Sequence, residues 1–404
     1  MKIVVQKFGG TSVATEELRQ QAIKRIKEAR EEGYHVVVVV SAMGRKGAPY
    51  ATDTLLSLTE SIEPNLPGRE KDILMACGEI ISGVVMTAQM LRSGMEAIFL
   101  TGWQSGILTS DHFGEARILS IKPDKIFDEL KKGKIVIVAG FQGSNEEKEI
   151  TTLGRGGSDT TAVALGAAMK AELVDIFTDV AGVMTADPRL VKGAKFLDKL
   201  TYQEVCQLAQ EGAKIIHPRA VDMAMQRQLT LRIRSTTSPA AGTLITDKEK
   251  DNIFAPQQRL ITGIAHRSQI TQIKLDISQL SKPSEIELKV FKAMAEAGIS
   301  VDFINVSPRI IIFTVDDTVA PKAIEILKSK NLHPDVISHC AKVAVVGMNM
   351  MGVPGVMARV VEALTRNQIT ILQSADSYTT IWCLIEEKNL TKAANALHQQ
   401  FCLD

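Results

Sequence analysis

The segment from Gly154 to Ala162, Gly-Arg-Gly-Gly-Ser-Asp-Thr-Thr-Ala, places an arginine and an aspartate among glycines just before an apolar helical stretch. Glycine lets the backbone approach a ligand closely, and the free amides at a helix start can hold an anion. Arg155 can bind a carboxylate or phosphate through two parallel hydrogen bonds. The segment therefore predicts an anion-binding loop. It is not a dinucleotide fingerprint, because Asp159 stands where the third glycine belongs.

A second glycine-rich turn, Lys7-Phe-Gly-Gly-Thr-Ser12, follows the first apolar stretch of the chain. Its lysine and two glycines suit a phosphate group, although a plain turn with a surface lysine would explain the same residues. The Gly-x4-Gly-Lys-Ser/Thr pattern of a Walker A loop is absent.

Three further positions carry charge in places that suggest a site. Glu79 lies on an otherwise apolar helix face, where it is either a buried structural partner or a ligand for an ammonium group. Lys214 opens an apolar stretch and could reach a phosphate. His217 precedes a proline and is interpreted as structural rather than catalytic.

Polar residues also follow a later apolar strand. Thr178-Asp179 end that strand, and Met184-Thr-Ala-Asp-Pro-Arg189 comes soon after. Aspartate before proline favours a turn, so simple turn chemistry would account for this segment as well.

The first 245 residues alternate predicted strands and helices, which indicates a mostly parallel α/β sheet covered by helices. Ligands in such sheets bind at the carboxyl ends of strands. Gly9-Gly10, Ser41 and Thr178-Asp179 all lie at such ends, so one shared cleft is expected. The expected strands are Ile3–Val5, Tyr34–Ser41, Ala97–Leu100, Ile135–Ala139 and Leu173–Thr178, and the expected helices are Thr15–Glu32, Asp72–Arg92, Lys122–Lys131 and Asp159–Ala171.

The pattern changes after a solvated linker, and beyond about residue 258 a βαββα cycle occurs twice. Two such units of about 70 residues predict a tandem ferredoxin-like module. The chain ends after the last helix, so the second unit lacks a fourth strand of its own. Unpaired sheet edges are costly, and we expect Arg259–His266 to fill this one. Strands are expected at Ile270–Ile277, Ser300–Val306, Ile310–Val315, Lys342–Met348, Thr370–Ser374 and Thr380–Glu386, with helices at Ser284–Ala297, Ala320–Lys328, Pro354–Asn367 and Leu390–Phe401.

Length and composition limit the class of protein. A chain of 404 residues is expected to form two or three domains. Its net charge of +1 gives no reason to expect nucleic acid or an anionic membrane as a partner. The five cysteines show no metal-ligand spacing, which is typical of reduced thiols in a cytoplasmic protein. No signal-peptide pattern opens the sequence, and the apolar runs fall short of the roughly 20 residues of a transmembrane helix.

Taken together, these motifs resemble the aspartate kinases of the amino-acid kinase family, over essentially the whole chain. The ordered set is Lys7-x-Gly-Gly, Ser41-Ala-Met-Gly, Gly78-Glu79, Gly154 to Asp159, Thr178-Asp179 and Met184 to Arg189. The repeat is similar to the paired ACT regulatory domains of those enzymes. The resemblance implies a carbamate-kinase-like three-layer αβα sandwich over 1–245, a linker over 246–258, and ACT domains over 259–340 and 341–404. The leading strand, 259–266, would complete the second ACT domain.

The resemblance also implies roles for individual residues. Lys7 and Asp159 would be catalytic. L-aspartate would be bound by Thr52, Glu79, Arg155, Gly156, Gly157 and Ser158. ATP, which would carry its own Mg²⁺ without a protein metal site, would be bound by Lys7, Phe8, Gly9, Gly10, Ser41, Thr178, Asp179, Met184, Thr185, Ala186, Asp187, Pro188, Arg189 and Lys214. Many relatives have tyrosine where Met184 stands, which puts the stacking on adenine in doubt.

The implied reaction is phosphorylation of the aspartate β-carboxylate to 4-phospho-L-aspartate. It would be the feedback-regulated first step toward lysine, diaminopimelate, threonine and methionine. Ser281-Lys-Pro-Ser-Glu285 departs from the common Asp-Lys-Pro-Gly of relatives, so meso-diaminopimelate is considered as effector beside lysine and threonine. A homo-oligomer formed through the ACT domains is expected. Two alternatives stay open, namely an amino-acid kinase with another acceptor and a non-catalytic amino-acid sensor.

Overall fold

The computed structural model describes residues 1–213, 215–247, 260–278, 283–348, 350 and 352–403. These residues form two compact units. The first contains 1–183, 196–209 and 215–247, and the second contains 184–195, 210–213 and the described residues from 260 onward. Most of the predicted linker, 246–258, lies outside the described residues.

The division differs from the continuous 1–245 domain expected from the sequence, because two short segments of that range belong to the second unit. Ala186 and Val191 are buried in the hydrophobic core of the second unit. The Glu211 carboxylate lies 3.3 Å from the Lys342 ammonium group. Thr185 is hydrogen bonded to His398 at 2.8 Å. Burial and ion pairing across long sequence separations, which no local pattern reveals, draw these segments into the second unit.

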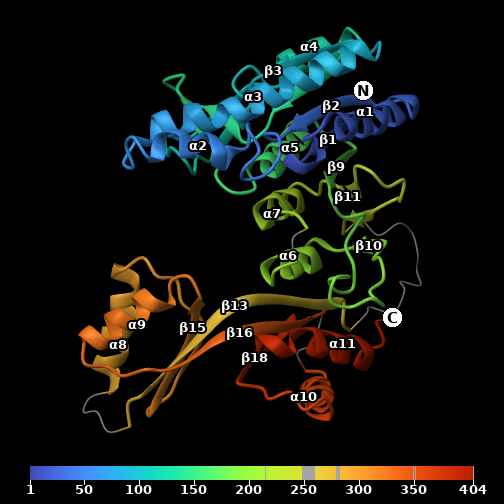
Figure 1. The fold of residues 1–404 in the computed structure, drawn as a ribbon. Coiled ribbons are helices and arrows are strands. Elements are labelled where there is room, and N and C mark those ends of the chain that lie inside the picture. Colours follow the sequence, from blue (N-terminus) through green and yellow to red (C-terminus); the bar gives the residue numbers. More distant parts are fainter. Residues whose placement is uncertain (214, 248–259, 279–282, 349, 351, 404) are drawn as a thin grey trace. The chain divides into compact units, whose positions relative to one another are not determined.

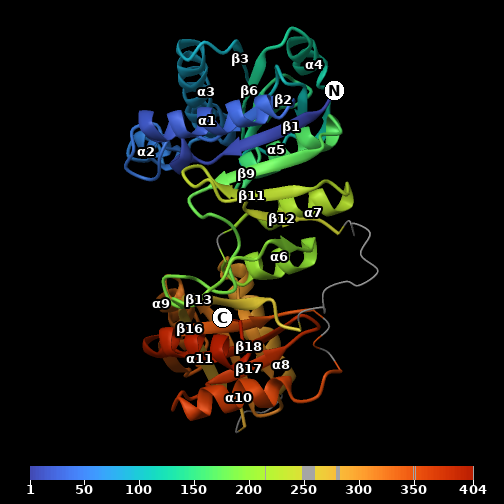
Figure 2. The same ribbon diagram turned by 90° about the vertical axis from the view of Figure 1, so that its right-hand side faces the viewer.

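An eight-stranded sheet forms the centre of the first unit, with the strand order β10-β12-β11-β9-β1-β2-β6-β3. Neighbouring strands are parallel except for β11 and β12. Figure 2 shows β1, β9 and β11 in succession. The strands are β1 (Ile3–Phe8), β2 (His35–Val40), β3 (Ala97–Leu100), β6 (Ile135–Ala139), β9 (Leu173–Thr178), β10 (Lys199–Leu200), β11 (Leu231–Ser235) and β12 (Thr243–Ile245).

Helices cover both faces of this sheet, which confirms the predicted αβα sandwich. Val4, Val36 and Val38 pack in one core with side chains of α1 (Glu16–Glu31) and α3 (Gly68–Arg92). Successive side chains of a strand point to opposite faces, and α5 (Gly157–Ala168) contacts β1 and β9 from the other side. The remaining helices are the 3-10 helix η1 (Gly10–Ser12), α2 (Thr52–Glu60), α4 (Asp124–Lys131), α6 (Tyr202–Gln210) and α7 (Pro218–Gln226).

A smaller four-stranded sheet, in the order β5-β4-β7-β8, flanks the cleft described below. It contains β4 (Ile107–Thr109), β5 (Ile118–Ile121), β7 (Gln142–Ser144) and β8 (Ile150–Thr152). Sequence periodicity did not reveal these short strands, because three or four residues carry too little pattern.

Helix α3 is long and apolar enough to cross a membrane by length and composition alone, although the apolar runs in the sequence did not suggest this. Its environment is that of a core helix. Met86 and Met90 are fully buried against the central sheet. The helix also buries the carboxylates of Asp72 and Glu79, and charged groups of this kind are costly in a bilayer.

The second unit is built on one six-stranded sheet, in the order β14-β15-β13-β16-β18-β17. Figure 1 shows helices α8 and α9 at one end of its long strands β13 and β16, and α10 and α11 at the other. The strands are β13 (Gly263–Asp276), β14 (Asp302–Val306), β15 (Ile310–Asp316), β16 (Asp335–Val346), β17 (Gln373–Asp376) and β18 (Thr380–Glu386), and the helices are α8 (Pro283–Glu296), α9 (Ala320–Ser329), α10 (Val356–Arg366), the 3-10 helix η2 (Glu387–Asn389) and α11 (Leu390–Gln400).

The two ferredoxin-like repeats share strands rather than sitting side by side. The first half of β13, Gly263–Arg267, pairs with Lys342–Val346 of β16, and its second half pairs with β15. The sequence analysis assigned these halves to separate segments, Arg259–His266 and Ile270–Ile277, but β13 is one continuous strand. In the same way β16 runs through the expected domain boundary at 340/341. Arg259 itself lies outside the described residues.

Candidate active site

A cleft of about 490 Å³ lies in the first unit, where β1, β2 and β6 end. Both predicted anion-binding loops reach it. Gly10 and Ser41 line it, as expected of one shared cleft, whereas Gly9, Thr178 and Asp179, which were expected there too, are not among its lining residues. Predicted site residues that line the cleft are Lys7, Gly10, Ser41, Thr52, Glu79, Arg155, Gly156, Gly157, Ser158 and Asp159. It is also lined by residues that the sequence analysis did not select, among them Asp53, Leu56, Met75, Gly114, Glu115 and Phe141.

Lys7 and Asp159 form an ion pair at the floor of the cleft, with 2.6 Å between Lys7 Nζ and the Asp159 carboxylate. Lys7 lies in β1, and Asp159 lies in the first turn of α5, the helix that packs on β1. The other Asp159 oxygen accepts a long hydrogen bond of 3.3 Å from the His217 backbone amide. Two residues 152 positions apart thus place one ammonium group and one carboxylate in the cleft.

Glu79 presents a buried carboxylate with one oxygen unsatisfied. The residue is only 3% exposed, and its Oε1 accepts a 2.9 Å hydrogen bond from the Ala42 amide. Its Oε2 is buried and has no hydrogen-bond partner among the residues that the structure describes. Burial raises the pKa of Glu79 to about 8. A buried, unpaired oxygen is costly, so a cationic ligand at Oε2 would satisfy a group that the fold leaves open.

The Gly154–Gly157 loop depends on backbone conformations that favour glycine. Gly154 and Gly156 have φ angles of 73° and 71°. A β-carbon on Gly156 would lie 2.2 Å from the His217 ring. His217 accepts a hydrogen bond from the Arg219 amide and caps α7, which agrees with its predicted structural role. Between these glycines Arg155 is exposed and forms no hydrogen bond or ion pair with the described residues.

Close packing explains why residue 10 is also a glycine. A β-carbon on Gly10 would lie 2.6 Å from the carbonyl oxygen of Ala42 and 2.7 Å from that of Gly44. The turn after β1 can therefore touch the turn after β2 only because residue 10 lacks a side chain. This contact brings Ser41 and Lys7 to the same cleft.

Asp72 positions one wall of the cleft, and sequence reasoning missed it. Its buried carboxylate accepts hydrogen bonds from the Gly114 amide at 3.0 Å and from the Thr152 amide and hydroxyl at 2.7 and 2.8 Å. Burial raises the pKa of Asp72 above its usual range. The carboxylate ties α3 to the loop that carries Gly114 and Glu115. Because its partners lie 42 and 80 residues away, no local motif could have identified it.

Several predicted nucleotide-binding residues lie elsewhere in the structure. The Phe8 ring is fully buried and stacks on Phe177 with 4.6 Å between ring centres, so only its backbone is available to a ligand. Thr178 is the last residue of β9, the neighbour of β1, and Asp179 follows it and pairs with the exposed Arg45 at 2.9 Å.

The predicted segment Met184–Arg189 belongs to the second unit. Ala186 is part of its core, and Asp187 forms an ion pair with Arg189 at 2.6 Å. Hydrogen bonds from the Arg189 side chain hold the pKa of Asp187 below its usual value. Lys214 lies outside the described residues. The nucleotide roles of all these residues stay predictions.

Comparisons with known proteins agree with this architecture. Residues 2–235 match the model of the amino acid kinase family. Over 404 residues the chain is 52% identical to aspartokinase 1 of Bacillus subtilis, and the match covers 99% of both chains. The chain belongs to the aspartokinases. An aspartokinase of Geobacillus stearothermophilus is 40% identical over 100% of this chain and 98% of its own.

The C-terminal half fits the same family. Residues 335–399 match an ACT domain model. Among solved aspartokinases, E. coli aspartokinase III in complex with lysine and aspartate superposes with a TM-score of 0.77 at 26% identity, covering 99% of this chain and 100% of that one. The agreement over both units confirms an amino-acid kinase domain followed by ACT domains.

Proposed function

We propose that the cleft transfers the γ-phosphoryl group of ATP to the β-carboxylate of L-aspartate, giving 4-phospho-L-aspartate and ADP. The observation that carries this proposal is the pairing of Glu79 and Arg155 in one cleft. Within the described part of the chain, Glu79 offers a buried carboxylate oxygen without a partner, and Arg155 offers an unpaired guanidinium. The ammonium and α-carboxylate of an amino acid are the two groups that complement them.

The β-carboxylate of the bound amino acid then needs no general base. An ordinary aspartate side chain has a pKa of about 3.9, so the attacking oxygen is already ionised at neutral pH. It forms a bond to the γ-phosphorus as the bond to the β,γ-bridging oxygen breaks and ADP leaves. The barrier is chiefly the repulsion between two anions, which positioned positive groups lower. Lys7 supplies a positive charge, and the amide of Gly10, which lines the cleft, supplies a dipole. The Gly9 amide already donates to the Phe177 carbonyl at 3.3 Å, so Gly9 is placed with the nucleotide on the family resemblance alone.

Asp159 is proposed to hold Lys7 in place and to face the Mg²⁺ carried by the nucleotide. The support is its position, since one carboxylate oxygen pairs with Lys7 and the other accepts one long hydrogen bond. Bound Mg²⁺ neutralises phosphate charge in reactions of this kind. On the substrate side, Thr52, Gly156, Gly157 and Ser158 would surround the amino acid.

The nucleotide would lie along the ends of β1, β2 and β9. Ser41 lines the cleft, Thr178 ends β9, and Asp179 follows that strand directly. Further nucleotide-binding residues are proposed on the family resemblance alone. They are Phe8, through its backbone, and Met184, Thr185, Ala186, Asp187, Pro188, Arg189 and Lys214.

Replacing Lys7 tests this assignment. The Lys7→Ala variant should lose about 100- to 1,000-fold in kcat, the usual cost of one electrostatic group at a transition state, while its melting temperature changes little. Lys2→Ala is the matched control, because Lys2 directly precedes β1, places its ammonium group 3.8 Å from the centre of the Tyr34 ring and is not among the residues that line the cleft. ATP turnover with aspartate measures both variants. Near-normal turnover of Lys7→Ala would remove Lys7 from the mechanism.

The ACT region is proposed to make this reaction the feedback-controlled entry to lysine, diaminopimelate, threonine and methionine. Support comes from the ACT match over 335–399 and from a solved relative whose complex contains lysine. An effector acts only by binding one conformation better than another. The candidate effectors are lysine, threonine and meso-diaminopimelate. We also expect the chain to form a homo-oligomer through its ACT units.

Titrating each amino acid against activity distinguishes these effectors. We expect one of them to lower turnover at least fivefold, the smaller end of typical coupling between sites. An unrelated amino acid such as alanine serves as the control. If none of the three changes turnover or the KM for aspartate, the regulatory assignment is wrong, whereas the catalytic assignment stands.

A further inference from the structure

The two repeats of the second unit place matching acidic residues at the centre of its sheet. Strands β15 and β18 are counterparts, and each is followed directly by a carboxylate, Asp317 in the first repeat and Glu387 in the second. Ile270 pairs with the last residue of β15, Cys340 pairs with the last residue of β18, and Ile270 pairs with Cys340. The axis relating the repeats therefore passes between Ile270 and Cys340, close to both carboxylates.

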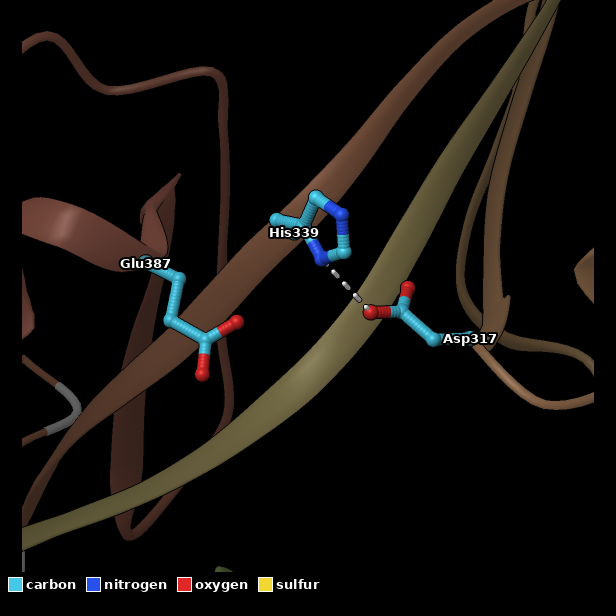
Figure 3. A group of neighbouring side chains, drawn as sticks. All are labelled: Asp317, His339 and Glu387. Atoms are coloured by element: carbon cyan, nitrogen blue, oxygen red, sulfur yellow. Dashed lines mark ion pairs between the residues drawn. The ribbon is translucent and has the colours of Figure 1, made fainter.

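The residues just before Ile270 and Cys340 share an unusual backbone conformation. Gln269 in β13 and His339 in β16 both have positive φ angles, 61° and 55°. Only the second repeat has an imidazole there. Figure 3 shows the His339 ring between the carboxylates of Asp317, which follows β15, and Glu387, the first residue of η2. Donor atoms of all three residues lie within 4.8 Å of one another.

The Asp317 carboxylate is held in one orientation. Its Oδ1 accepts a 2.5 Å hydrogen bond from the Thr271 hydroxyl, and its backbone amide donates to the Gln269 carbonyl at 2.9 Å. This leaves Oδ2 directed at His339 Nδ1, 3.4 Å away. That distance exceeds the 2.7–3.2 Å of an N–H···O hydrogen bond. It equals the separation of about 3.3–3.6 Å between two donors that each lie about 2.0–2.2 Å from one tetrahedral zinc ion.

Neighbouring cations do not neutralise the two carboxylates. Arg267 pairs with Asp316, and Lys388 pairs with Glu386, the residues just before them. Among the described residues, His339 is the one basic group paired with Asp317, and Glu387 has no ion-pair partner. Two partly buried carboxylates and one imidazole thus face each other with excess negative charge.

From this geometry we propose that Asp317, His339 and Glu387 form a divalent transition-metal site, with Zn²⁺ as the preferred ion. Imidazole favours zinc, nickel or copper over magnesium and calcium, which prefer oxygen ligands alone. Three protein ligands would leave one of the four positions around a tetrahedral Zn²⁺ ion for water. Because the ligands come from β16 and from the ends of β15 and β18, the ion joins the two repeats across their axis, and it is distinct from the Mg²⁺ that enters with ATP.

Zinc binding to the metal-free full-length chain, without nucleotide, tests the proposal by isothermal titration calorimetry. The wild type should bind one Zn²⁺ per chain at this site. His339→Gln and Glu387→Gln should each weaken binding at least 10- to 100-fold. His333→Gln is the matched control, since His333 is also exposed in the second unit but, among the described residues, belongs to no cluster of metal-ligating side chains. This variant should bind as the wild type does. The melting temperatures of the metal-free variants should agree, because the His339 side chain is 84% exposed.

Cobalt substitution distinguishes these ligands from cysteine. Co²⁺ at the site should give visible absorption without a thiolate charge-transfer band, and His339→Gln should abolish it. Wild-type affinity in both ligand variants, or no stoichiometric Zn²⁺ binding by the wild type, would overturn the proposal. A thiolate band that disappears in Cys402→Ser, the exposed cysteine, would overturn it in favour of a cysteine site.

Discussion

At the scale of single residues, the cleft combines charges that the fold leaves incompletely satisfied. Lys7 and Asp159 neutralise each other at 2.6 Å, whereas Glu79 Oε2 has no partner among the described residues and Arg155 is unpaired. Lys7, Glu79, Arg155 and Asp159 could be selected from the sequence because glycine-rich or apolar surroundings made their charges conspicuous. Asp72 could not, because its function depends on amides brought to it by folding.

Arg155→Ala should chiefly weaken aspartate binding. A charge-assisted hydrogen bond contributes about 1.5–3 kcal/mol, so the KM for aspartate should rise about 10- to 150-fold while kcat changes less. Arg117→Ala, another exposed arginine of the first unit, is the control and should have wild-type kinetics. Steady-state kinetics with varied aspartate measures both. A large fall in kcat at unchanged KM would show that Arg155 acts on the phosphoryl group instead.

The pKa of Glu79 predicts a pH dependence for aspartate binding. Burial raises this pKa from 4.5 to about 8, so below pH 8 the free carboxyl group is mostly protonated and must lose its proton before it can pair with an ammonium group. Apparent affinity for aspartate should therefore rise with pH, by up to about tenfold per unit, and level off near pH 8.

Glu79→Gln isolates this effect, because it removes the titration of residue 79 and leaves other ionisations in place. The variant should bind aspartate weakly, and the difference between its profile and that of the wild type should show the rise toward pH 8. Direct binding measurements from pH 6 to 9 provide the comparison. Parallel profiles for the two proteins would exclude Glu79 as the ammonium ligand.

At the scale of structural elements, tight turns after parallel strands bring the cleft together. Strands β1, β2, β3, β6 and β9 and helices α1, α3, α4 and α5 follow the predicted order, since long apolar runs and helical periodicity identify them. The strands β10, β11 and β12 of the same sheet and the helices α2, α6 and α7 were not predicted. The short strands β4, β5, β7 and β8 carry little pattern and were not predicted. The contact between the turns after β1 and β2 depends on Gly10, and the loop before α5 depends on Gly156.

Gly156→Ala should destabilise the first unit more than an ordinary glycine substitution. Its φ of 71° costs an L residue about 1–2 kcal/mol, and the clash with His217 adds about 1–3 kcal/mol of overpacking. Gly133→Ala is a matched control, because Gly133 has a φ of 82° but open space around its β-carbon position. Urea unfolding measures both free energies. Equal losses for the two variants would show that the His217 contact does not constrain the loop.

At the scale of the whole molecule, the chain joins a catalytic unit to a regulatory one. The 70-residue repeat predicted the tandem ferredoxin-like module, but the sequence did not show that β13 and β16 each serve both repeats. It also did not predict that 184–195 and 210–213 belong to the second unit. Those segments are held by Glu211 with Lys342 and by Thr185 with His398, contacts between residues more than 130 positions apart.

The central claim is that the chain makes an acyl phosphate on aspartate. Hydroxylamine traps acyl phosphates as coloured hydroxamates, so the purified chain with L-aspartate, ATP and Mg²⁺ should produce aspartyl hydroxamate in step with ADP. Lys7→Ala should reduce that signal about 100-fold or more, and acetylglutamate or glutamate in place of aspartate should give none. Absence of hydroxamate with aspartate, or a stronger signal with another acceptor, would contradict the account.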